Sequence, residues 1–191
     1  QLEDVATQYF GVIFSNFRVE GLLRDCDRTI AGIATPRTQE LHRAVERVSE
    51  RSRIFFSGIS MARMASGNAE RARYSPEAMA EHFEEGMMLV GALEGLEATL
   101  ALAVQPRQPG EQDEADAVDM TEALSALQRR AEELRTELRF LMRADAEEFV
   151  YFLEVRDRGI FLRASPIDVS SIVRDTLLAR MKTEVLTSAT L

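Results

Sequence analysis

Three long stripes of apolar residues, each with the spacing of a helix, constrain the fold of this 191-residue chain most strongly. Apolar residues that recur three, four and seven positions apart lie on one face of an α-helix, and such a face must be buried. Long helices bury such stripes against one another, so the sequence predicts an antiparallel bundle of long helices. The stripes consist of Leu41, Val45, Val48, Phe55 and Ile59, of Met79, Phe83, Met87, Val90, Leu93, Leu96 and Leu100, and of Leu124, Leu127, Leu134, Leu138 and Leu141.

A hydroxyl residue followed by proline marks the expected starts of the first two long helices, at Thr35-Pro36 and Ser75-Pro76. The hydroxyl can cap the first turn, and proline is tolerated there because its missing N–H would have no helical partner anyway. An earlier helix is expected from about Asn16 to Ile30, after a short helix within 2–10. Its inward side chains are predicted to be Phe17, Leu22, Leu23 and Cys26.

The stretch "QPRQPGEQDEADA" is the clearest loop of the chain, because it contains two prolines, a glycine and many acids. We therefore expect a mobile loop over 105–118. Asp119 with Glu122 resembles a capping box, which predicts that the third long helix starts there.

The pattern changes after about Asp145, where "FVYFLEV" and "IFLRA" are rich in β-branched and aromatic residues. "RDRG" lies between them, so the sequence predicts a β-hairpin whose turn ends at Gly159. Asp168 can cap a last helix to about Lys182, and a strand through Val185 and Leu186 follows. The expected fold is mainly α, with a small β-hairpin and a C-terminal strand.

The residues that most enzyme sites need are scarce. The chain has one cysteine, Cys26, and two histidines, His42 and His82, and none of them stands at a metal-ligand spacing. It has no phosphate-binding glycine loop and no hydrolase motif, so we expect no catalytic residue and no metal site in these 191 residues. We find neither a signal segment nor an unbroken apolar run of membrane-spanning length, which favours a cytoplasmic protein without a membrane partner.

Charge is distributed unevenly along a chain whose net charge is −9. The range 37–73 holds eight arginines and four glutamates, a net charge of +4, whereas 77–122 holds twelve acids and one arginine, a net charge of −11. Two interpretations stay open: the two segments are neighbouring helices that pair by charge, or the arginines form a basic edge for a polyanion.

Both ends of the chain resemble motifs of one enzyme family. "TSATL" at 187–191, preceded by "SPIDVSSIVRDTLLARMKTEV", resembles the third helicase motif of the DinG-like and XPD-like superfamily 2 DNA helicases. "QLEDVATQYFG" at 1–11 resembles the segment that follows the Asp-Glu-Ala-His box of that family. The hairpin is also similar, although Phe152 or Leu153 replaces a tryptophan that is common there.

The resemblance implies a fragment of an ATP-dependent 5′-to-3′ DNA helicase. In that family the segment between these two motifs holds a helical insertion, the arch domain, beside which single-stranded DNA passes. The parent would use ATP and magnesium, and the resemblance leaves open whether it also holds an iron–sulfur cluster. This fragment would hold none of the three. Its motor domains would be missing here, so the exposed motor-facing surface could also mediate self-association. Thr187, Ser188 and Thr190 would couple nucleotide state to DNA in the parent.

On this resemblance the chain has three parts. Residues 1–34 would be a helical segment leaving the motor core, 35–145 the arch bundle with its mobile loop, and 146–191 the hairpin, helix and strand that return to the motor core. Arginines of the bundle would contact DNA backbone phosphates without reading sequence. The alternative is a free-standing helical protein-interaction module. The candidate DNA-binding residues are Arg43, Arg47, Arg51, Arg53, Arg63, Arg71 and Arg73.

Overall fold

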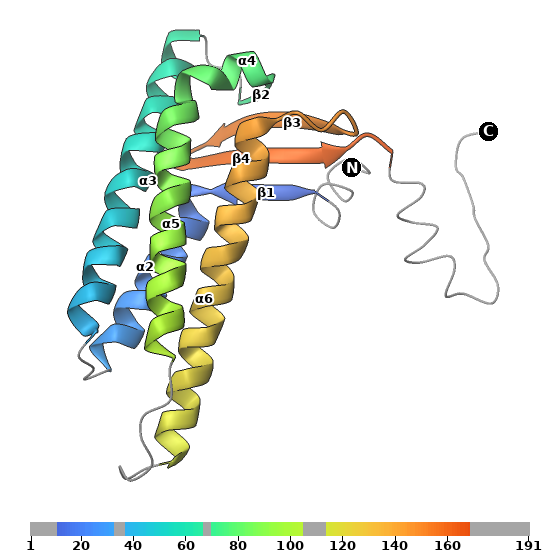
Figure 1. The fold of residues 1–191 in the computed structure, drawn as a ribbon. Coiled ribbons are helices and arrows are strands. Elements are labelled where there is room, and N and C mark those ends of the chain that lie inside the picture. Colours follow the sequence, from blue (N-terminus) through green and yellow to red (C-terminus); the bar gives the residue numbers. More distant parts are fainter. Residues whose placement is uncertain (1–10, 33–36, 67–69, 105–113, 169–191) are drawn as a thin grey trace, which may run out of the picture.

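The predicted bundle of long antiparallel helices is present. The protein was studied as a computed structural model, which describes residues 11–32, 37–66, 70–104 and 114–168. Four long helices lie side by side, and each runs opposite to the one before it (Figure 1). They are α2 (Asn16–Ala31), α3 (Thr38–Ser66), α5 (Phe83–Ala103) and α6 (Glu114–Arg143).

A four-stranded antiparallel sheet lies across one end of the bundle (Figure 1). The predicted hairpin is confirmed as β3–β4, with its turn at Asp157 and Arg158, and Asp157 takes the left-handed φ of 51°. Two further strands extend it, in the order β1-β4-β3-β2. The strands are β1 (Val12–Ser15), β2 (Arg71–Arg73), β3 (Phe149–Arg156) and β4 (Gly159–Pro166).

One face of the sheet, which we call the inner face, completes the hydrophobic core. Tyr151 and Leu162 project from β3 and β4 into that core, and the Tyr151 ring lies 5.8 Å from the ring of Phe140 on α6. The hydroxyl of Tyr74, just after β2, donates a hydrogen bond of 3.1 Å to the carbonyl of Leu141. Helix α6 therefore packs against the sheet, and one hydrophobic core extends from the bundle to the sheet.

Helix α5 packs between α3 and α6. Within the described residues, 76–103 is long and apolar enough by composition to cross a membrane, with a mean hydropathy of 1.4 in its best window. The sequence alone did not indicate such a segment. Its apolar residues include Leu89, Val90, Leu93, Leu96 and Leu100, which are buried against the neighbouring helices. Burial against these two helices accounts for part of this hydropathy, since 39% of that best window is buried.

The predicted start of the third long helix was wrong. Helix α6 begins at Glu114, so 114–118 is helical rather than part of the loop, and Asp119 lies inside the helix instead of capping it. The physical reason is that acidic side chains favour the N-terminal turns of a helix, where the helix dipole is positive. A run of acids that was interpreted as loop thus belongs to the first turns of α6.

Two details of the apolar pattern were also wrong. The second stripe is not one helix, because α4 (Pro76–Met79) and a 3₁₀ turn (Ala80–His82) precede α5. The tighter turn changes the helical period, and Phe83 is 43% exposed. Phe17 does not face the core either: it is 49% exposed, and its ring lies 6.0 Å from that of Phe161 on the sheet.

Several predictions lie outside the described residues. They are the short helix within 2–10, the cap at Thr35-Pro36, the loop at 105–113, and the helix and strand after Asp168. The cap at Ser75 is confirmed, because its hydroxyl accepts a hydrogen bond of 3.4 Å from the backbone N–H of Ala78.

Candidate nucleic-acid interface

Arg43, Arg47 and Arg51 form a row along α3, beside α5. Arg43 and Arg47 are exposed, and Arg51 is half-buried. The Arg47 guanidinium nitrogen Nη1 lies 3.9 Å from the position that a Cβ atom would take at Gly95. Arg51 Nη1 lies 3.3 Å from Met88 Sδ. The row therefore follows the surface seam between α3 and α5.

Two acids of α5, Glu94 and Glu97, pair with α6 rather than with this row. Arg135 Nε lies 2.8 Å from Glu97 Oε2, and Arg139 Nη2 lies 3.9 Å from Glu94 Oε2. Within the described part of the chain, no ion pair joins Arg43, Arg47 or Arg51 to a carboxylate. Of the two interpretations left open by the sequence, charge pairing between α3 and α5 is thus not seen for these three arginines, and the row keeps its positive charge.

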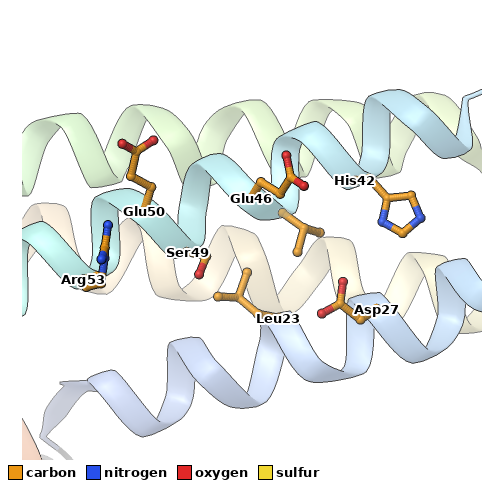
Figure 2. A pocket seen from close by; sticks show the side chains of 8 residues that line it. Leu23, Asp27, His42, Glu46, Ser49, Glu50 and Arg53 are labelled. Carbon is orange, nitrogen blue, oxygen red and sulfur yellow. The ribbon is translucent and has the colours of Figure 1, made fainter.

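Arg53 lies in different surroundings, in a groove between α2 and α3 (Figure 2). The groove has a volume of about 440 Å³, and three carboxylates lie along it with this single arginine. A polyanion would meet net negative charge there, so Arg53 is a poorer candidate than the row. The lining residues are Leu23, Asp27, His42, Val45, Glu46, Ser49, Glu50 and Arg53.

Arg71 and Arg73 lie in strand β2, which the sequence did not predict. A strand of three residues has too little pattern to be seen in the sequence, and β2 forms only because β3 offers it a free edge. The side chain of Arg63, on α3, lies outside the described residues, as do Thr187, Ser188 and Thr190. The sequence candidates are therefore divided between α3, the α2–α3 groove and the sheet.

The sheet brings Arg71 and Arg73 together with side chains that the sequence did not indicate as ligand-binding residues. Side chains alternate between the two faces of a strand, and residues paired across an antiparallel ladder share a face. Since Tyr151 and Leu162 point into the core, their chain neighbours point away from it. We call this second side the outer face, and the pairing places on it Arg71, Arg73, Phe152, Glu154, Arg156, Phe161 and Arg163.

Charge on the outer face is strongly positive. Its strands carry four arginines and one glutamate, a net charge of +3. Glu154 is only 2% exposed and forms ion pairs with Arg156 and with Arg163, whose Nε lies 2.7 Å from Glu154 Oε2. Arg71 pairs with Glu154 in register but is left without a share of its carboxylate.

Two other arginines, Arg18 on α2 and Arg130 on α6, are neutralised by acids across the contact between these helices. Arg18 pairs with Glu137, and burial raises the pKa of that carboxyl although Arg18 acts in the opposite direction. Arg130 Nη1 lies 2.6 Å from Asp25 Oδ2, and this hydrogen bond lowers the pKa of Asp25. Arg71, Arg73 and the α3 row thus differ from the arginines that serve packing between helices.

Comparison with protein-family models and with curated proteins found no match to this chain. Among the described residues, no three His, Cys, Asp or Glu side chains gather as a metal site would require. The motifs at the two ends and the arginines of the described surface are therefore the features from which a function can be inferred.

Proposed function

We propose that this chain is the arch region of a DinG-like, ATP-dependent 5′-to-3′ DNA helicase. It helps to guide single-stranded DNA past the motor and carries out no catalysis itself. The motif resemblance at 1–11 and 187–191 supports this proposal, because a helical insertion connects the same two motifs in that family. A mainly helical fold with a small sheet is compatible with such an insertion.

The observation that carries the proposal is the row of Arg43, Arg47 and Arg51. Three guanidinium groups that form no ion pair with a carboxylate of the described residues are suited to phosphate contacts, which give affinity without sequence preference. The neighbouring acids do not compete for them, because Glu94 and Glu97 pair with α6. A row on a long helix can follow a nucleic-acid backbone along its length.

The proposal assigns the remaining functions to the parent protein. ATP and magnesium would bind its motor domains, to which the C-terminal strand would belong, and Thr187, Ser188 and Thr190 would couple nucleotide state to DNA there. An iron–sulfur cluster in the parent would need cysteines from elsewhere, since this chain has one cysteine and such clusters are held by four. A cytoplasmic location belongs to the same proposal.

The experiment measures binding of the chain to a fluorescent oligothymidylate as a function of salt. Changing Arg43, Arg47 and Arg51 together to Gln should reduce the slope of log affinity against log salt by about 2, at about 0.7 for each lost single-strand contact. The matched control changes Arg24, Arg129 and Arg143, three exposed arginines on other surfaces, and should leave the slope unchanged. An equal effect of both triple variants would contradict a specific role for the row.

A protein-interaction module is the second candidate, and one observation favours it. Met88 and Leu102 on α5 are 43% and 45% exposed, and Ala98 is exposed between them. This apolar stripe beside the arginine row could pack against a helix of a partner. The coding sequence around the chain separates the two candidates: a phosphate loop and an Asp-Glu-Ala-His box upstream favour the helicase, and their absence favours the module.

A further inference from the structure

We infer that the outer face of the sheet binds single-stranded nucleic acid, with phosphates at Arg71 and Arg73 and bases against Phe152 and Phe161. This inference rests on the proposed function for the class of ligand, but its residues are separate from the α3 row. Neither the motifs nor the sequence pattern pointed to this face. It forms only when β2, β3 and β4 pair.

The arginines of the outer face compete for one carboxylate. Arg156 and Arg163 both pair with Glu154, which is buried beneath them. The same carboxylate lies opposite Arg71 in the ladder, and no ion pair joins Arg71 or Arg73 to any carboxylate of the described residues. The Nε of Arg71 is buried and has no hydrogen-bond partner among the residues that the structure describes. Two guanidiniums on one edge strand thus remain available to an anion.

Two aromatic rings lie beside the arginines of the outer face. Phe152 and Phe161 are half-buried on the outer face and do not belong to the core or its packing partners. Phe152 pairs with Arg163, two residues after Phe161 on β4, so Phe152 and Phe161 are diagonal neighbours on one face, with Cα atoms about 7–8 Å apart. Bases stack on such rings whatever their identity, while arginines neutralise the backbone.

Guanidinium groups already lie over the two aromatic rings, where a base would stack. Arg71 lies 3.9 Å from the centroid of the Phe152 ring, and Arg163 lies 5.4 Å from that of Phe161. A base can stack on Phe152 when the Arg71 guanidinium moves to a phosphate, which exchanges one favourable contact for two, whereas Arg163 keeps its ion pair with Glu154. An acidic peptide would use the arginines but not the rings, so single-stranded nucleic acid matches both features.

The test uses the full chain and two probes: an oligothymidylate, and an oligomer of the same length with abasic deoxyribose units. Changing Arg71 and Arg73 to Gln should weaken binding of both probes at least fivefold. Changing Phe152 and Phe161 to Leu should weaken only the probe with bases, also at least fivefold. Phe152→Tyr should retain affinity because it keeps a ring. Phe83→Leu, on exposed α5 surface, is the matched aromatic control.

Each outcome has a definite meaning. Equal loss with Phe152→Tyr and Phe152→Leu, or equal loss of both probes in the Leu variants, would overturn the stacking role. Unchanged binding in the Arg71 and Arg73 variant, with loss in the α3 triple variant, would overturn the inference and leave the proposed function standing. Loss in the sheet variants alone would support the inference and remove the α3 row from the proposal. Absence of binding by the unaltered chain would reject both.

Discussion

The guanidinium of Arg71 lies 3.9 Å from the centroid of the Phe152 ring, on the neighbouring strand. This contact is diagonal, because Arg71 pairs in register with Glu154 and Arg73 pairs with Phe152. Arg71 leans over the ring while Arg156 and Arg163 occupy the carboxylate. The contact therefore holds the Arg71 side chain against β3 and leaves it without an ion pair to any carboxylate of the described residues.

A double-mutant cycle should detect this contact. Arg71→Gln and Phe152→Leu, alone and together, should show a coupling energy of about 0.5–1 kcal/mol in the free energy of unfolding, as expected for a partly exposed cation–π pair. Urea denaturation followed by circular dichroism measures it. Strict additivity of the two single changes would show that the ring and the guanidinium do not stabilise each other.

Two glycines should respond in opposite directions to alanine. A Cβ at Gly159 would lie 2.6 Å from ring atoms of Phe161 and of Phe17, so Gly159→Ala should destabilise the chain by about 1–3 kcal/mol. At Gly91, within α5, a Cβ would meet nothing within 4 Å. Gly91→Ala should therefore stabilise by about 0.5–1 kcal/mol, through its better helix propensity. Thermal melting of the two variants compares these signs directly.

The elements that could be predicted from the sequence are those whose apolar residues repeat at a regular spacing within the element itself. Long stripes such as Leu41 to Ile59 and Leu124 to Leu141 predict helices because each helix is amphipathic before it meets a partner. The hairpin was predictable for the same reason, since both strands and their turn are contiguous. Strands β1 and β2 were not, because four and three residues carry no period and their partners lie far along the chain.

The candidate site was difficult to predict from the sequence for a related reason. The sequence could name Arg43 or Arg71 as basic, but every arginine is basic, and availability to a ligand depends on tertiary partners. Arg135 and Arg139 are neutralised by acids of α5, which only the packing of α5 on α6 reveals. The outer face needs the strand register as well, because a shift of one residue would turn Phe152 into the core.

Stability should depend on pH through Asp25. Its hydrogen bond from Arg130 lowers the pKa of the carboxyl below its ordinary value of 3.8. A carboxyl with a lowered folded-state pKa stabilises the fold above its unfolded pKa, and this contribution disappears as the pH falls. Asp25→Asn should therefore cost up to about 1 kcal/mol at pH 7, as for a partly exposed pair, and progressively less below about pH 4. Glu132→Gln, exposed on α6, is the control. A difference that is constant with pH would contradict the assignment.

The thiol of Cys26 should be inert in the folded chain. It is fully buried in α2, and burial, aided by the charge of Asp27, raises its pKa to about 12. Because the thiolate is the reactive form, labelling by a thiol reagent at pH 8 should be at least about a hundredfold slower than in urea. Ser57→Cys in a Cys26→Ser background gives an exposed thiol on α3 for comparison. Equal rates for the two thiols would show that the α2 core opens readily.

Glu154 allows the stability and the binding of the outer face to be separated. It is 2% exposed and holds two guanidiniums, so Glu154→Gln leaves their charges without a counterion. The free energy of unfolding should fall by about 1–3 kcal/mol, the usual cost of a lost partner for a buried polar group. Glu147→Gln, exposed before β3, should change it little.

The same change should strengthen binding of single-stranded nucleic acid. Removing the one acid of the outer face raises its net charge by one and releases Arg156 and Arg163 for phosphates. Each new phosphate contact should make the salt slope steeper by about 0.7. A variant that is less stable and yet binds an oligothymidylate more tightly cannot owe the gain to better folding. Weaker binding by a variant that is fully folded at the assay temperature would show that Glu154 serves the ligand surface by positioning its arginines, rather than by competing with phosphates for them.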